Sequence, residues 1–160
     1  MEDIRIVELP AFQYLSFNGF GNSPELLAIG KLREWLEHNQ SIIGPTRYFG
    51  FNNPDPAPGS ENYGYEIWAV IPEGNATLYP DVKSFSGGLY ALSHCSGLLE
   101  EAEKFIPESW KGLTAWIESS PYRLGHHQWL EEHLGDEKLN FIDLLGDGKM
   151  SLNLYMPIVK

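Results

Sequence analysis

The sequence predicts an α+β fold made of two similar modules, each running strand–helix–strand–strand. Three observations predict it. Short runs rich in β-branched and aromatic residues alternate with amphipathic helical stretches, proline and glycine separate these elements, and segments of the first half recur in the same order in the second. A chain of 160 residues suits one domain, 1–160, with repeats at about 1–72 and 82–160. We expect an antiparallel sheet with its helices on one side, a pseudo-two-fold relation between the modules, and a ligand cleft between them.

The first module is expected to contain one helix among several strands. Ser23 is placed to cap this helix, and Pro24 occupies its first position, where a missing N–H group is tolerated. The proline-rich stretch 53–62 cannot pair in a sheet and predicts a loop. The expected elements are strands at 3–10 and 11–21, a helix at 23–39, and strands at 46–53 and 63–72.

The second module is expected to repeat this order. A strand at 83–97 precedes a helical stretch at 98–120, which we expect to be interrupted near Pro107, and the chain ends in a strand within 141–160. Segment 126–135, "HHQWLEEHLG", is ambiguous. Its Glu, Leu and His residues favour a helix in isolation, whereas its position in the repeat favours a strand.

The repeat rests on matched positions at nearly constant separation. Four pairs are 81 residues apart, one is 76 apart and one is 85 apart, which indicates small insertions between elements. The pairs at 81 are Leu32 with Leu113, Trp35 with Trp116, Gly44 with Gly125 and Tyr48 with Trp129, and the others are Tyr14 with Tyr90 and Pro72 with Pro157.

Alternation along the expected strands assigns side chains to faces. In 126–135, one face carries Trp129, Glu131 and His133. The other face carries Leu130, Glu132 and Leu134, and we expect this leucine face to lie under the second helix. In the last strand, Leu152, Leu154, Met156 and Ile158 are expected to form core, as are Ile67, Ala69 and Ile71 in the first module.

The faces turned away from the helices are therefore expected to carry aromatic side chains and carboxylates. Such walls suit flat, lipophilic and often cationic molecules, because ring stacking and cation–π contacts each supply roughly 0.5–2 kcal/mol. A desolvated carboxylate adds selectivity for positive charge. The candidate ligand-binding residues are Glu131, Glu66, Trp68, Trp129, Tyr155, Tyr48 and Tyr90.

Composition excludes several other classes. With 11 Lys and Arg against 22 Asp and Glu, the formal net charge is −11, so a direct nucleic-acid-binding role is not expected. No long apolar run predicts a membrane span, and no signal peptide is visible, so we expect a cytoplasmic protein. His126, His127 and His133 are of metal-ligating types, but adjacent strand residues diverge, so neither a metal nor another cofactor is expected.

Several segments together resemble a known family. "GGLYALSHCSG" before the second helix, "WKGLTAWIESS" within it, "WLEEH" after it and the closing "LNLYMPIV" resemble a stand-alone bacterial GyrI-like domain. This small-molecule-binding fold is shared with effector-binding domains of AraC-type and multidrug-sensing regulators. In the family, the strand after the second helix carries a glutamate that faces the ligand. The resemblance implies Glu131 for that role, with Glu132 as the competitor, because His133 stands where the family often has an aromatic residue.

The resemblance implies three functions. The first is binding of lipophilic, aromatic or cationic small molecules. The second is hydrolysis of cyclopropane-bearing genotoxic compounds, with Glu131 as the catalytic residue if the protein is an enzyme. The third is modulation of DNA gyrase, or of a regulator, through a protein–protein contact.

Overall fold

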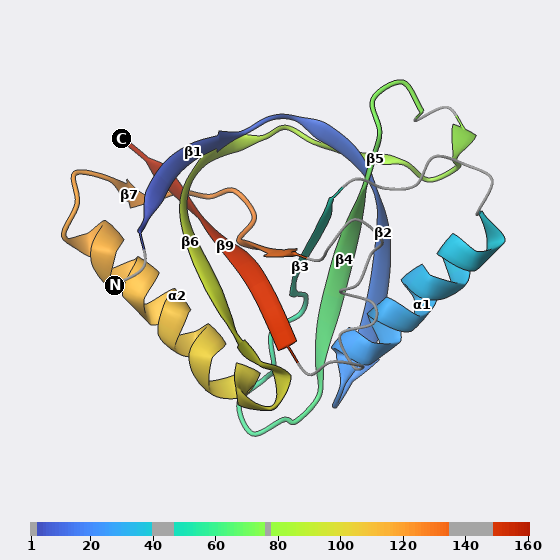
Figure 1. Ribbon diagram of the computed structural model, residues 1–160, viewed down its shortest axis with the longest axis horizontal. Helices are drawn as coiled ribbons and strands as arrows, with labels where there is room; N and C mark the ends of the chain where they lie inside the picture. Colours follow the sequence, from blue (N-terminus) through green and yellow to red (C-terminus); the bar gives the residue numbers. More distant parts are fainter. Residues whose placement is uncertain (1–2, 40–46, 76–77, 135–148) are drawn as a thin grey trace. The chain divides into compact units, whose positions relative to one another are not determined.

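The computed structural model describes residues 3–39, 47–75, 78–134 and 149–160 of the chain. Within them, two α-helices accompany antiparallel strands, which confirms the predicted α+β class (Figure 1). The chain divides into two compact units. One unit comprises residues 11–86, and the other comprises residues 1–10 together with 87–160. Neither described helix has the length and apolar character needed to cross a membrane.

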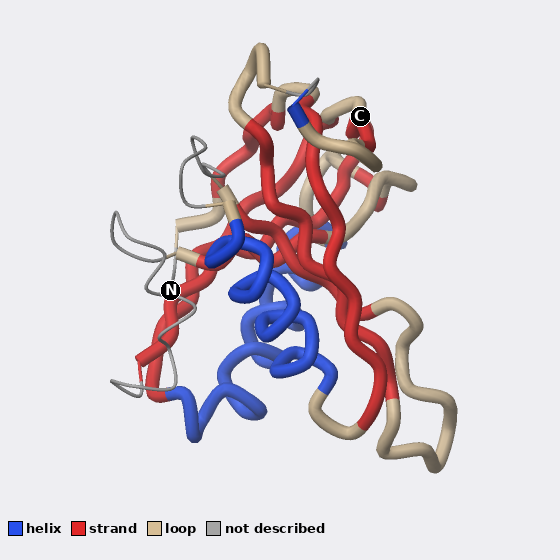
Figure 2. Tube along the Cα trace, turned by 90° about the vertical axis from the view of Figure 1, so that its right-hand side faces the viewer, coloured by secondary structure: helices blue, strands red, loops and turns tan. Residues whose placement is uncertain are grey.

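The unit formed by residues 11–86 has a four-stranded antiparallel sheet in the order β3–β4–β2–β5. In Figure 2, α1 lies in front of the strands of this sheet. Its elements are β2 (Phe12–Gly21), α1 (Pro24–His38), β3 (Tyr48–Asn52), β4 (Tyr63–Ile71) and β5 (Lys83–Phe85).

The unit that contains residues 87–160 has the sheet order β1–β6–β9–β8, and the short β7 also pairs with β9. Its helix α2 follows β6 through a 3₁₀ turn. The elements are β1 (Arg5–Leu9), β6 (Gly88–Leu98), η2 (Leu99–Glu101), α2 (Ala102–Glu118), β7 (Arg123–Leu124), β8 (Leu130–His133) and β9 (Lys149–Val159).

Each sheet has a short strand at one edge that lies next to the other unit in the sequence. β1 precedes residues 11–86 in the sequence but pairs with β6, where Val7 lies opposite Tyr90. β5 directly precedes β6 in the sequence but pairs with β2, where Lys83 lies opposite Tyr14. In chain order, the unit of residues 11–86 has β2, α1, β3, β4 and β5, and the other unit has β1, β6, α2, β7, β8 and β9.

Helix α1 packs closely on its sheet because β2 has a glycine below it. A Cβ atom on Gly19 would stand 2.3 Å from the carbonyl oxygen of Pro24 and 2.9 Å from the backbone nitrogen of Ala28. Ala28 and Leu32 of α1 are fully buried, and so are Ile67 and Ala69 of β4. The sequence-based assignment of the odd-numbered β4 residues to the core is therefore confirmed.

Helix α2 runs without a break through Pro107, so the expected interruption there is wrong. Pro107 removes one backbone donor, but Leu113 and Ile117 still bury their side chains against the sheet, and this packing holds the helix on its face. The prediction of a core on β9 is confirmed: Leu152, Leu154, Met156 and Ile158 pack together with those helix residues.

Candidate functional site

Strand β8 has the opposite orientation to the one expected from the sequence. Glu131 lies opposite Leu154 of β9, and Leu154 belongs to the core beneath α2. Residues that lie opposite each other in an antiparallel pair point to the same side of the sheet. Glu131 therefore points to the α2 side, and Leu130 and Glu132 point away from it. The expectation that the leucine face lies under the helix is wrong.

On the α2 side, Glu131 contacts the helix directly. The indole Nε1 of Trp110 donates a hydrogen bond of 3.3 Å to Glu131 Oε2. The rings of Trp110 and Trp129 lie 5.4 Å apart. Trp129 is 38% exposed, so it forms an open contact with the helix. Trp129 and Glu131 thus lie together, as the alternation predicted, but on the helix-covered face.

Glu132 is the buried carboxylate on the other face. It is only 7% exposed, and Tyr155 Oη donates a hydrogen bond of 2.7 Å to Glu132 Oε1. The ring of Tyr90 meets that of Tyr155 edge to face, with centroids 5.8 Å apart. Tyr90 is held in turn by donating from its hydroxyl to the carbonyl oxygen of Gln128 at 2.7 Å. Burial raises the pKa of Tyr90, so its hydroxyl stays a donor at neutral pH.

His133, the neighbour of Glu132, points to the α2 side opposite Leu152. Burial lowers its pKa from 6.5 to about 4, and the nearby charge of Glu132 opposes this shift only partly. The imidazole is therefore neutral at physiological pH. Glu132 and His133 together place one carboxyl group and one neutral imidazole, both buried, on opposite faces of the same short strand.

The unit of residues 11–86 has its own aromatic face, turned away from α1. Trp68 of β4 stacks on Tyr14 with centroids 4.1 Å apart and planes at 22°, and Phe51 meets Trp68 edge to face at 5.1 Å. Phe12 stacks on Phe49 at 5.4 Å. The members of this aromatic face are Phe12, Tyr14, Phe49, Phe51, Trp68 and Phe85.

Glu66 lies at the end of this aromatic face. Trp68 Nε1 donates to Glu66 Oε2 at 2.6 Å, and Asn53 Nδ2 donates to Oε1 at 3.1 Å. Burial, and then the charge of Glu66, raise the pKa of Tyr14. Trp68 and Glu66 thus lie together in the structure. Tyr48 does not join them, because it lies opposite Ala69 and faces α1.

The candidate residues therefore fall into three groups. Tyr90 and Tyr155 lie with Glu132, Glu66 lies with Trp68, and Glu131 lies with Trp129 under α2, while Tyr48 lies apart from all three groups. Tyr14 was not among the expected site residues, although its sequence match to Tyr90 pointed to it. Phe51 had no signal of its own, because a phenylalanine in a strand indicates core as readily as a ligand site.

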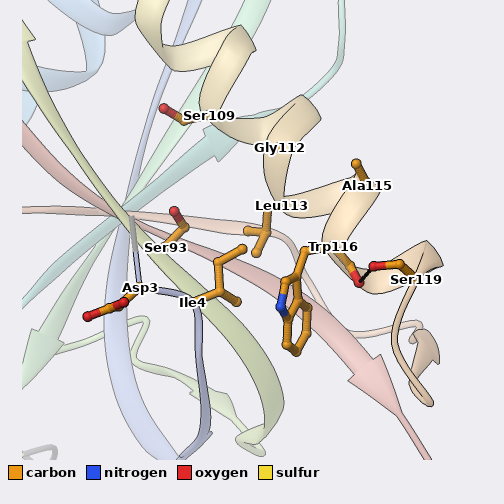
Figure 3. A pocket seen from close by; sticks show the side chains of 9 residues that line it. All are labelled: Asp3, Ile4, Ser93, Ser109, Gly112, Leu113, Ala115, Trp116 and Ser119. Atoms are coloured by element: carbon orange, nitrogen blue, oxygen red, sulfur yellow. Dashed lines mark hydrogen bonds between the residues drawn. The ribbon is translucent and has the colours of Figure 1, made fainter. Parts of the chain in front are cut away.

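A separate hollow of about 720 Å³ lies on the α2 side, between the helix and the sheet edge (Figure 3). Small helix residues, Ser109, Gly112 and Ala115, leave room there, while Ile4 and Trp116 form apolar walls. Asp3 is the one charged residue in the lining drawn from the described part of the chain. The hollow contains none of the candidate residues and lies on the face opposite Glu132.

The two α+β units fit a match between this chain and a family of effector-binding proteins. The family model described as "integron-associated effector binding protein" matches residues 5–158. This chain belongs to that family. Comparison with curated protein sequences gave no match.

Solved structures support the same fold at low sequence identity. The EcmrR C-terminal domain is 13% identical with a TM-score of 0.65, and the match covers 100% of this chain and 99% of that one. A hydrolase from Listeria innocua is 14% identical with a TM-score of 0.56, covering 99% and 92%. SAV2435 bound to tetraphenylphosphonium is 10% identical with a TM-score of 0.53, covering 98% and 94%. In a complex of EcmrR with DNA, the match covers 57% of the EcmrR chain.

Proposed function

We propose that this protein binds lipophilic, aromatic or cationic small molecules, and that Glu132 is the carboxylate that contacts a positive charge. The observation that carries the proposal is the burial of Glu132 beside Tyr155, on the sheet face that α2 leaves uncovered. Of the two glutamates that the sequence left open, Glu132 has the tyrosine neighbours, and Glu131 has the helix.

The chemistry of these groups favours a soft, poorly hydrated cation. A carboxylate that has already been removed from water loses little further hydration when a ligand arrives, so its attraction for a cation is only weakly screened. The rings of Tyr90 and Tyr155 meet edge to face, and the hydroxyl of Tyr155 contacts Glu132. A cation over the face of such a ring gains about 0.5–2 kcal/mol. A strongly hydrated ion such as sodium would have to give up its water shell for the same contacts.

Relatives favour the same class of ligand. The family name refers to effector binding, and SAV2435 binds tetraphenylphosphonium, a lipophilic cation with four phenyl rings. The aromatic face around Trp68 and Tyr14 provides a further surface of the same chemistry, and Glu66 provides a second carboxylate. We assign Glu132 to charge recognition in the unit that contains residues 87–160, and Trp68 to ring stacking on the separate aromatic face of the unit of residues 11–86.

Tetraphenylphosphonium and the neutral triphenylphosphine oxide are suitable matched probes. Glu132→Gln should weaken binding of tetraphenylphosphonium by tenfold or more, because loss of a buried charge contact costs roughly 2–5 kcal/mol. Binding of the neutral oxide should change little. Isothermal titration calorimetry measures both affinities, and Glu131→Gln is the matched control, with the same chemical change on the opposite face. Equal loss in both variants, or loss in Glu131→Gln alone, would refute the assignment to Glu132.

Hydrolysis is the second candidate, because a buried carboxylate could also act as a general base and one similar structure is a hydrolase from Listeria innocua. A cyclopropane-bearing alkylating compound tests it in the same experiment. Consumption by the wild type that falls about 10²-fold or more in Glu132→Gln would establish catalysis. Binding of this compound without consumption would leave the protein a binder.

A further inference from the structure

The outer edge of β2 is open over most of its length. On one side, β2 pairs with β4 from Gln13 to Gly21. On the other side, β5 pairs only with Phe12, Gln13 and Tyr14. Among the residues that the structure describes, no strand pairs with this side of β2 beyond Tyr14. The remaining edge, Leu15–Gly21, is long enough to accept another strand of typical length.

Hydrogen bonds of β4 show which backbone groups of β2 point outward. The N–H of Val70 donates to the carbonyl oxygen of Arg47 at 2.9 Å, and the N–H of Gly64 donates to the carbonyl oxygen of Pro54 at 2.9 Å. The backbone N–H and C=O groups of even-numbered β4 residues therefore point to the β3 side. Odd-numbered β4 residues then point to β2, because successive strand residues alternate. The backbone N–H and C=O groups of their β2 partners, Leu15 and Phe17, therefore pair with β4 inside the sheet. The N–H and C=O groups of the even residues Ser16, Asn18 and Phe20 point to the open edge.

A pocket of about 470 Å³ lies at this edge. Its aromatic wall is held by packing: the rings of Trp35 and Tyr79 are 5.4 Å apart, and those of Phe17 and Trp35 are 6.1 Å apart. The lining residues are Leu15, Ser16, Phe17, Asn18, Trp35, Tyr79, Pro80, Asp81 and Lys83. The pocket therefore joins outward-pointing backbone groups to a recess with an aromatic wall.

The pairing of β5 with the outer side of β2 ends at Lys83. Lys83 is the last residue opposite β2, and the chain before it turns through Asp81, which has a positive φ of 62°, and Pro80, which has no N–H. Natural edge strands are commonly protected by lysine, proline or a bulge. Ser16, Asn18 and Phe20 provide neither charge nor proline, and Phe20 is 61% exposed.

We propose that the outer edge of β2 binds an extended peptide by strand addition, with one large apolar side chain of the peptide in the Trp35–Tyr79 pocket. An alternating row of donors and acceptors matches a peptide backbone, and the recess selects a side chain. The opposite charges of Asp81 and Lys83 balance each other beside the pocket. The net charge of −11 of the whole chain therefore favours a peptide that carries basic residues. This activity is separate from the small-molecule site at Glu132.

A short fluorescein-labelled peptide tests the proposal, with a central phenylalanine flanked by alternating valine and lysine. Fluorescence anisotropy measures its affinity. Asn18→Pro removes an outward N–H without breaking the ladder to β4, since proline is tolerated on a strand edge whose N–H faces solvent. It should weaken binding about tenfold or more. Asn18→Ala keeps the N–H and should bind as the wild type does. Equal affinity of the two variants would overturn the proposal.

Backbone N-methylation of the peptide gives a test that needs no variant. Methylation at alternate residues removes the donors that would pair with β2, and binding should be lost, while methylation at the other residues should have little effect. Failure of the unmethylated peptide to bind the wild type, or indifference to methylation, would overturn strand addition. So would a dimer in sedimentation velocity that Asn18→Pro dissociates, because a second copy would then occupy the edge. Glu132→Gln should leave peptide binding unchanged.

Discussion

The hydroxyl of Tyr155 donates a 2.7 Å hydrogen bond to Glu132 Oε1, and both side chains are buried. The two residues come from neighbouring antiparallel strands, where Glu132 lies opposite Asn153 and Leu130 lies opposite Tyr155. The contact is therefore a diagonal one on a single face of the sheet. It holds the carboxylate of Glu132 in one position, and variants of the two residues can test whether this contact forms in solution.

Tyr155→Phe should destabilise the protein by about 1–3 kcal/mol, because a buried charged acceptor loses a donor while the ring and its packing remain. Urea denaturation followed by circular dichroism measures this change. Tyr63→Phe is a useful comparison. Tyr63 donates to Glu25 Oε1 at 2.5 Å, but in a partly buried place that water can reach, so its loss should cost less.

The double variant Tyr155→Phe with Glu132→Gln separates the hydrogen bond from other effects. If the two side chains interact in solution, the free-energy changes of the single variants will not add. Additive changes would show that the contact between Tyr155 and Glu132 contributes nothing to stability in solution.

His133 should make stability depend on pH in a defined window. Its pKa is lowered from 6.5 to about 4 in the folded protein, so between these values the unfolded chain binds a proton that the folded chain does not. Stability is then fully present above about pH 6.5 and falls as the pH drops toward 4. The full loss is on the order of 3 kcal/mol for a shift of this size.

His133→Gln tests this linkage, because glutamine does not titrate. The unfolding free energy of the variant should fall less steeply than that of the wild type between pH 6.5 and 4, while acid loss from carboxylates at lower pH remains in both. Parallel curves through this window would contradict a buried neutral imidazole. Urea denaturation at a series of pH values gives both curves.

Local signals explain why much of the fold was predictable from the sequence. The helix expected at 23–39 is found at Pro24–His38, because Pro24 marks its start without help from the rest of the chain. The Ser23 side chain makes no capping hydrogen bond, so the expected cap is wrong. The core faces of β4 and β9 followed from simple alternation over nine and eleven residues. Pro107 was misleading, because packing of the apolar face of α2 outweighs one missing hydrogen bond.

The orientation of β8 was not predictable in the same way. The strand has only four residues, and polar side chains occur on both of its faces, so nothing local distinguishes the two orientations. A shift of one residue exchanges Glu131 for Glu132. Tyr48 and Trp129, which were matched in the sequence, both face a helix in the structure. The match could not be used to orient β8, because the face of Tyr48 becomes known only from its pairing with Ala69.

Two glycines of the unit formed by residues 11–86 should respond to alanine in opposite directions. Gly19→Ala would place a Cβ atom within 2.9 Å of α1 backbone atoms, so the helix must move away from β2. We expect a loss of roughly 1–3 kcal/mol, as for other forced overpacking. Gly30, in the middle of α1, has nothing within 4 Å of such an atom. Gly30→Ala should therefore gain about 0.5–1 kcal/mol through the better helix propensity of alanine. Chemical denaturation of both variants measures the two signs. A gain in Gly19→Ala would show that α1 does not pack on β2 at this distance, whereas a loss in Gly30→Ala would show that this face of α1 is covered in solution.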